Sequence, residues 1–315
     1  MAVIAVVGAG LIGRAWAIAF ARAGHEVRIH DGAAGAAETA AQFAASVLPA
    51  LAAEDLLESQ SPNEVAARLK PVGTLTAALA GARHVQENTP EDLETKKRVF
   101  AELDQAAAPD AVLASSTSAL LPSRFTEDLA GRARCLVVHP INPPYLIPAT
   151  EIVPAPWTDP AVVERTRALM SAAGQSPIVM KREIDGFVMN RLQGALLEEA
   201  FRLVADGYAS VEDVDIGIRE GLALRWSFIG PFETIDLNAP AGVRDYVVRD
   251  QQIYSRLFPS MQRRVDWAGE VIEAVERARR AKLPEADLQR RQMWRDRRLM
   301  ALTAHKRKAA REIGS

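Results

Sequence analysis

Short apolar runs rich in β-branched residues alternate with longer segments of helical spacing over the first part of the chain. Such runs are typical of buried parallel strands, and apolar residues that recur every three or four positions indicate amphipathic helices. The predicted strands span residues 2–7, 26–30, 72–74, 84–86, 112–114, 135–138, 151–153 and 178–180. The predicted helices span residues 11–23, 33–57, 64–69, 91–107 and 160–173. Because strands and helices alternate, the sequence predicts an α/β fold with a doubly wound sheet.

The pattern changes near residue 185, beyond which almost every periodic segment is helical. Helices are predicted at residues 186–206, 211–220, 232–237 and 242–257. The charged stretch 263–311 mixes acids with bases through position 296, which is typical of solvated amphipathic helices. We therefore divide the chain into a doubly wound domain, residues 1–184, and an all-helical domain, residues 185–315.

A glycine-rich turn separates the first predicted strand from the first predicted helix. Gly8 permits a tight turn, Gly10 permits the close approach of a pyrophosphate, and Gly13 permits close packing of helix on strand. Leu11 and Ile12 lie in the same turn, at the helix N-terminus. The free N–H groups and partial positive charge of that terminus favour phosphate groups.

An acidic residue, Asp31, closes the second predicted strand. A carboxylate at this position accepts hydrogen bonds from the hydroxyls of an adenosine ribose and repels a 2′-phosphate, so NAD is favoured over NADP. A glycine motif alone also fits a purely structural turn. With strand, glycine turn, helix, strand and acid in this order, the sequence predicts a Rossmann-type domain that binds NAD.

Composition and charge narrow the class of protein. The chain has 315 residues, 49% of them hydrophobic, and a net charge of −2, which gives no electrostatic reason to expect nucleic acid or an anionic membrane as a partner. Its one cysteine, Cys135, excludes an intrachain disulfide framework. We find no basic leader segment, no apolar stretch of about 18 residues and no cluster with metal-ligand spacing. A cytoplasmic location is the expectation.

Four polar residues stand near predicted strand ends or at the start of the long interdomain helix: Ser118, His139, Glu151 and Asn190. In open α/β sheets the carboxyl ends of the strands hold the ligand. Together with NAD, such a set suits the oxidation of a secondary alcohol, in which histidine takes the hydroxyl proton and a carboxylate stabilises the imidazolium. Taken singly, three of these residues have simpler explanations. His139 also fits a surface or core histidine, Ser118 a helix cap or turn, and Asn190 an interdomain hydrogen bond.

The chain resembles the L-3-hydroxyacyl-CoA dehydrogenase superfamily, and within it the lambda-crystallin branch, whose enzymatic member is L-gulonate 3-dehydrogenase. The resemblance covers nearly the full length. It lies in the segments 8–14, 90–94, 115–118, 139–145, 186–193 and 228–234. It implies that His139 is the base, Glu151 its carboxylate partner, and Ser118 and Asn190 the contacts of the substrate oxygen.

The same resemblance implies further cofactor contacts and a partner. Glu91 and Lys96 are expected near the nicotinamide ribose, and Asn142 close to the nicotinamide. Members of the family are typically homodimers that pair through the helical domain. A second copy of the chain is therefore an expected partner, beside the small-molecule substrate.

Charge distribution favours a free acid over a CoA thioester as substrate. From residue 32 to residue 69 the one basic residue, Arg68, stands against five acids, which disfavours the phosphates of CoA. Arg225 is the candidate for a substrate carboxylate, and the lambda-crystallin branch also has an arginine here; an interdomain salt bridge is the alternative. The prediction is NAD-dependent oxidation of a small L-3-hydroxy acid, L-gulonate first. A short-chain L-3-hydroxyacyl-CoA dehydrogenase and a catalytically idle, crystallin-like NAD-binding protein remain as alternatives.

Overall fold

The computed structural model describes residues 1–314 and divides the chain into two compact units. The first unit comprises residues 1–188 and 296–304. The second comprises residues 189–295 and the segment that begins at His305. The domain boundary at residue 184 stays a prediction, and each unit is described by itself below.

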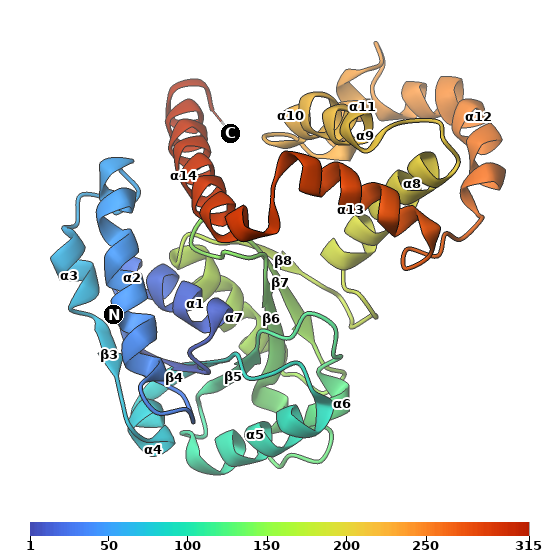
Figure 1. Ribbon diagram of the computed structural model, residues 1–315. Helices are drawn as coiled ribbons and strands as arrows, with labels where there is room; N and C mark the ends of the chain where they lie inside the picture. Colours follow the sequence, from blue (N-terminus) through green and yellow to red (C-terminus); the bar gives the residue numbers. More distant parts are fainter. Residues whose placement is uncertain (315) are drawn as a thin grey trace. The chain divides into compact units, whose positions relative to one another are not determined.

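Within residues 1–314, the first unit contains an eight-stranded sheet in the order β3-β2-β1-β4-β5-β6-β7-β8 (Figure 1). The strands are β1 (Val3–Val7), β2 (Glu26–His30), β3 (Leu69–Pro71), β4 (Ala82–Glu87), β5 (Val112–Ser115), β6 (Cys135–Pro140), β7 (Ala149–Pro154) and β8 (Ser176–Val179). Strands β1 to β6 are parallel, β7 is antiparallel to β6, and β8 is parallel to β7. The predicted Rossmann-type sheet is confirmed. The predicted position of the third strand, residues 72–74, is wrong, because this strand lies at Leu69–Pro71.

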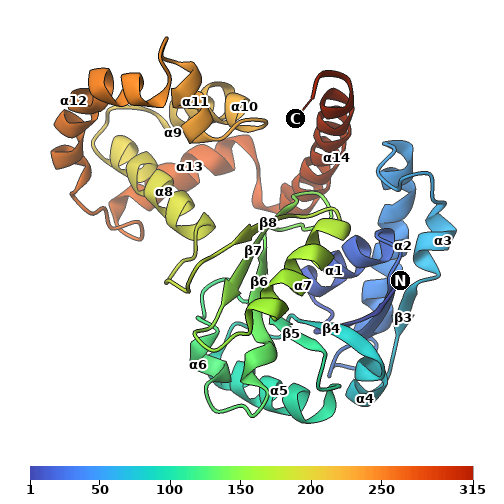
Figure 2. The same cartoon turned by 180° about the vertical axis from the view of Figure 1, so that it is seen from behind.

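Helices cover both faces of this sheet, and side chains alternate between them along each strand. The helices are α1 (Leu11–Arg22), α2 (Ala36–Ala53), α3 (Pro62–Ala66), α4 (Leu75–Leu79), α5 (Leu93–Ala106), α6 (Ser123–Thr126) and α7 (Pro160–Ala172). Ile4 and Val6 belong to a core that includes residues of α1, α2, α3 and α7, whereas Ala5 and Val7 belong to a second core that includes residues of α4, α5 and α6. Both views of the ribbon show these two layers (Figure 1 and Figure 2). The strand period of two therefore builds two separate cores.

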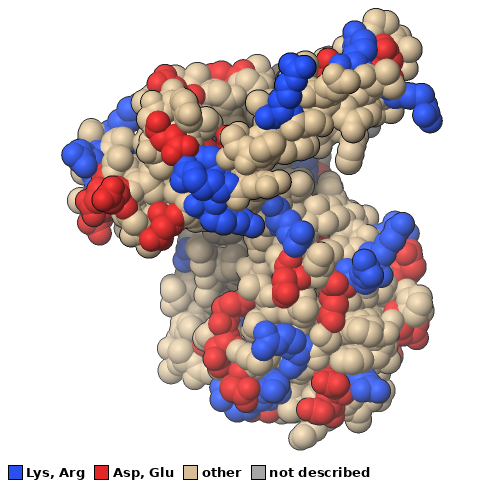
Figure 3. All heavy atoms as spheres, turned by 90° about the vertical axis from the view of Figure 1, so that its right-hand side faces the viewer, with Lys and Arg blue, Asp and Glu red and all other residues tan. Residues whose placement is uncertain are grey.

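The second unit is helical, as the sequence predicts. Its helices are α8 (Met189–Ala205), α9 (Val211–Ile216), a π-helical segment (Gly217–Leu222), α10 (Ala223–Trp226), α11 (Pro231–Leu237), α12 (Val243–Met261) and α13 (Glu270–Lys282). None of the helices within residues 1–314 combines the length and the apolar character needed to cross a bilayer. Acidic side chains lie among the basic ones on the face shown in Figure 3.

The last helix, α14 (Leu288–Ile313), brings part of the charged stretch back to the first unit. Met300 is 5% exposed and belongs to the core that α1 and α7 share with the sheet. One turn later, the Thr303 hydroxyl donates to the Leu146 carbonyl oxygen at 3.3 Å. The sequence predicts a solvated stretch here, and this segment is instead anchored on the loop between β6 and β7.

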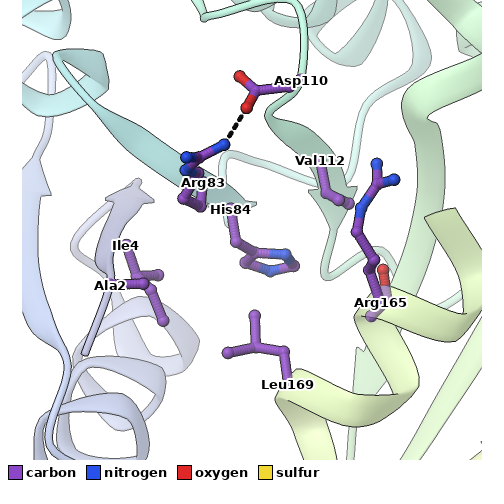
Figure 4. Close-up of a pocket in the computed structure, with 9 residues that line it drawn as sticks. Ala2, Ile4, Arg83, His84, Asp110, Val112, Arg165 and Leu169 are labelled. Atoms are coloured by element: carbon purple, nitrogen blue, oxygen red, sulfur yellow. Dashed lines mark hydrogen bonds and ion pairs between the residues drawn. The ribbon is translucent and has the colours of Figure 1, made fainter.

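A buried histidine, His84, lies near the amino end of β4, beside a cavity of about 370 Å³ (Figure 4). The Gln86 amide donates to Ser116 Oγ at 2.7 Å, so its oxygen accepts from His84 Nε2 at 3.0 Å. The remaining ring nitrogen, Nδ1, has no hydrogen-bond partner within residues 1–314. Burial lowers the pKa of His84 to about 4, which keeps the imidazole neutral in the folded protein.

Neutral His84 makes the stability of the first unit dependent on pH. Above 6.5, the ordinary pKa, folded and unfolded chains are both uncharged at this residue. As the pH falls from 6.5 towards 4, only the unfolded chain binds the proton, so the free energy of unfolding decreases. The expected difference between about pH 7.5 and about pH 5 is about 2 kcal/mol. Urea denaturation of the wild type and of His84→Gln measures it, and His305→Gln, at an exposed histidine, is the control. An equal pH dependence in the wild type and His84→Gln would contradict this prediction.

Candidate active site

The glycine turn between β1 and α1 has the shape that the sequence predicts. A Cβ on Gly8 would lie 2.7 Å from the Asn88 carbonyl carbon, and one on Gly13 would lie 1.9 Å from the Gly8 oxygen. A Cβ on Gly10 would meet no atom within 4 Å. Gly8 and Gly13 are therefore required by the fold, whereas Gly10 leaves open space in front of helix α1. No side chain caps this helix, so its first N–H groups face that space and fit a pyrophosphate.

Asp31 follows β2 and ties the glycine turn to the next loop. Its Oδ2 accepts a hydrogen bond from the Ala9 amide at 2.7 Å, and its Oδ1 accepts one from the Ala33 amide at 2.8 Å. An ionised carboxylate has about four acceptor positions. Each oxygen thus retains the capacity to accept from a ribose hydroxyl, as the NAD prediction requires.

His139 and Glu151 form a buried pair at the carboxyl edge of the sheet. Antiparallel pairing of β6 with β7 sets the two residues directly opposite each other, so both side chains lie on the same face. His139 Nδ1 lies 2.6 Å from Glu151 Oε2, and the residues are 4% and 0% exposed. The other oxygen, Oε1, accepts from the Val188 amide at 2.7 Å. In this arrangement Nδ1–H donates to the carboxylate, and Nε2 is the nitrogen that remains to accept a proton.

Asn142 lies on the loop that joins these two strands. Its Oδ1 is buried and accepts no hydrogen bond from the described part of the chain, residues 1–314. A buried acceptor of this kind calls for a donor from outside the chain. The amide N–H of a nicotinamide fits it chemically.

Glu91 holds the loop that presents Ser118. Its Oε1 accepts from the amides of Ser118 and Ala119, each at 3.0 Å, and from Thr117 Oγ at 2.5 Å. Ser118 itself is exposed at the end of this loop. The predicted contacts of Glu91 with the cofactor and of Ser118 with the substrate stay predictions.

Lys96 lies in a buried ion pair that the sequence analysis does not predict. It is 1% exposed, and its Nζ donates to Glu87 Oε1 at 2.8 Å, to Oε2 at 3.0 Å and to the Thr89 carbonyl at 2.9 Å. Glu87 also accepts from the Ser115 hydroxyl. Lys96 therefore fixes the turn after β4, and its predicted contact with the cofactor stays a prediction. One feature of the sequence could have indicated this pair: Glu87 is an acidic residue at the end of the strand β4, which is otherwise mostly buried.

The two remaining predicted residues belong to the second unit. Asn190 is exposed in the first turn of α8. Arg225 is exposed on α10, and no carboxylate pairs with it among residues 189–295 and 305–314. Their roles in substrate binding stay predictions.

Family models match both parts of the chain. The NAD binding domain of 3-hydroxyacyl-CoA dehydrogenase matches residues 3–184, and the C-terminal domain of the same enzyme matches residues 186–281. The chain belongs to the 3-hydroxyacyl-CoA dehydrogenase family. This dehydrogenase is an NAD-dependent oxidoreductase that acts on CH–OH groups.

Individual relatives agree with this family. A lambda-crystallin homolog of Bos taurus is 42% identical over 302 residues, which are 95% of this chain and 94% of that protein. An L-carnitine dehydrogenase of Pseudomonas putida is 39% identical over 244 residues, 77% of this chain and 75% of that protein. The solved structure of 5-formyl-3-hydroxy-2-methylpyridine 4-carboxylic acid 5-dehydrogenase, an NAD⁺-dependent dismutase, is 27% identical. It has a TM-score of 0.81 and covers 98% of each chain.

The different surroundings of Gly10 and Gly13 separate cofactor binding from folding. Gly10→Ala should leave thermal stability almost unchanged and raise the Kd for NADH at least about 10-fold, because the methyl group occupies the space that the pyrophosphate needs. Gly13→Ala should lower thermal stability and also weaken NADH binding, because its Cβ overlaps the Gly8 oxygen. Fluorescence titration with NADH and thermal melts measure the two effects. Gly73→Ala, also in open space, is the control. Unchanged NADH affinity in Gly10→Ala would contradict the assignment.

Proposed function

We propose that this dehydrogenase oxidises the 3-hydroxyl of a small L-3-hydroxy acid to the 3-keto acid. NAD⁺, held at the glycine turn and Asp31, would supply the hydride acceptor. His139 Nε2 takes the hydroxyl proton, and Glu151 stabilises the imidazolium that forms. Ser118 and Asn190 hydrogen-bond the reacting oxygen as it becomes a carbonyl. The buried 2.6 Å contact between His139 and Glu151 is the observation that carries this proposal.

A free acid is favoured over a CoA thioester by the charges of residues 32–69, the segment that contains α2 and α3. Arg68, the one basic residue between positions 32 and 69, already donates to Gln60 Oε1 at 2.6 Å and to the Ala21 carbonyl at 2.9 Å. The same segment carries five acids, which would repel the phosphates of CoA. L-Carnitine, named in one group of relatives, is itself a 3-hydroxy acid with a free carboxylate. L-Gulonate is the first substrate to test, because the lambda-crystallin relatives match nearly the full chain.

The same proposal includes a homodimer. Helix α12 has no buried side chain within the chain, and many large apolar side chains of the second unit are exposed. Among the most exposed are Tyr208 (79%), Phe228 (72%), Phe232 (80%) and Val248 (76%). Apolar surface of this extent is typical of an interface between subunits. Light scattering on the intact chain, whose mass is 34.2 kDa, tests the pairing. The cytoplasmic location stays a prediction.

Loss of the proposed base tests the reaction. His139→Gln should lower kcat for a free L-3-hydroxy acid by about 10²- to 10⁴-fold and leave the Kd for NADH nearly unchanged. Absorbance of NADH at about 340 nm follows turnover, with L-gulonate, L-carnitine, 3-hydroxybutyrate and its CoA thioester as a panel. Much faster turnover of the thioester would select the CoA alternative. Tight NADH binding without turnover of any substrate would select the catalytically idle alternative.

Arg225 is proposed to bind the substrate carboxylate through paired hydrogen bonds. Arg225→Met should raise KM for a free 3-hydroxy acid by about 10- to 100-fold, the value of a lost charge-assisted contact, with a smaller change in kcat. The matched control substrate is the uncharged amide of the same acid. An equal loss with acid and amide would instead make Arg225 a structural residue.

A further inference from the structure

The segment that leaves the first unit, residues 186–188, has an unusual backbone. Gly186 and Phe187 both have positive φ, at 78° and 49°. Glycine adopts this conformation readily, but an aromatic residue rarely does. Phe187 is also 0% exposed, so its conformation is fixed by its surroundings. Backbone conformations of this kind persist where the surrounding structure holds them, and they concentrate at functional sites.

Two consecutive residues of this segment contact the two members of the buried pair. The Phe187 ring lies against the His139 imidazole, with ring centroids 5.6 Å apart and planes inclined at 54°. The next amide, that of Val188, donates to Glu151 Oε1 at 2.7 Å. The positive φ of Phe187 turns the chain so that its ring and the following N–H both reach the pair.

We propose that Phe187, with the Val188 amide, is a positioning residue for the His139–Glu151 pair; this inference rests on the proposed role of His139. The Val188 amide occupies one carboxylate oxygen, so the other stays directed at Nδ1. The Phe187 ring limits rotation of the imidazole and keeps water from the Nδ1–Oε2 hydrogen bond. Nε2 is thereby held in one direction. The chain then enters α8 at Met189 with no intervening loop, and α8 carries Asn190.

Phe187→Leu tests the role of the ring. We expect kcat for oxidation of the 3-hydroxy acid to fall by about 10- to 100-fold, while KM for that acid and the Kd for NADH change less than about 2-fold. Phe125→Leu is the matched control, because Phe125 lies in the same core and packs edge-on against Phe100, with ring centroids 4.8 Å apart. It should lower thermal stability and leave kcat unchanged. If Phe187→Leu does not fold, Phe187→Met retains more of the side-chain volume. Unchanged kcat in the folded Phe187 variant would overturn the proposal.

A double mutant separates positioning from general disruption. In the His139→Gln background, Phe187→Leu should cause no further loss of the residual rate, because its effect passes through the imidazole. A full additional loss there would overturn the proposal.

A proton signal provides a readout that needs no turnover. The Nδ1–H proton of His139, assigned by its absence in His139→Gln, should be protected from solvent exchange in the wild type and in Phe125→Leu, and lost in Phe187→Leu. Retention of the signal in Phe187→Leu would overturn the proposal. If the wild type and the two variants show this pattern of signals but the wild type oxidises no acid, the proposed function fails while the positioning role stands.

Discussion

The reversal of strand direction at β7 is the constraint on which the proposed chemistry depends. Six parallel strands bring their carboxyl ends to one edge of the sheet, and β7 returns antiparallel from that edge. A residue near the start of β7 therefore meets a residue near the end of β6 without any long connection. His139 and Glu151 occupy such opposed positions, and their short hydrogen bond lies in a buried environment, where such bonds are strong.

Carboxylates recur along this edge, and each of them holds a loop by accepting backbone N–H groups. Asp31 accepts from Ala9 and Ala33, Glu91 from Ser118 and Ala119, and Glu151 from Val188. Glu87 accepts from the Thr89 amide at 2.5 Å and is neutralised by Lys96. Loop amides beyond the strand ends have no sheet partner, and a carboxylate satisfies them with a strong, directional bond. Because burying the Glu87–Lys96 pair carries a large desolvation cost, we attribute its role to the geometry of this edge and not to added stability.

Sequence reasoning predicted the elements of the first unit well where periodicity is strong, and less well where tertiary contacts decide. Strand β2 and the glycine turn followed directly from apolar runs and glycine spacing. Periodicity does not report strand direction, so the reversal at β7 was not predictable from it. The edge strand β3 is three residues long and poor in apolar residues, which explains the shift from the predicted position. The positive φ of Phe187 and the anchoring of Met300 depend on contacts distant in the sequence, and no local pattern signals them.

The residues proposed for cofactor binding and catalysis lie mostly in the first unit, and those proposed to recognise the rest of the substrate lie in the second. For this reason the reaction is more readily inferred than its substrate. The glycine turn, Asp31, Asn142 and the His139–Glu151 pair all belong to the first unit, which has its own cores. These groups are the ones proposed to contact NAD and the CH–OH group that it oxidises, which the substrates of such enzymes share. The residues proposed to recognise the rest of the substrate, Asn190 and Arg225, lie in the second unit. Relatives of similar identity bear names as different as lambda-crystallin and L-carnitine dehydrogenase. Because the proposed contact of the substrate carboxylate, Arg225, lies in the helical unit, we expect the residues that select the substrate to lie in that unit and in the subunit pair that it is proposed to form.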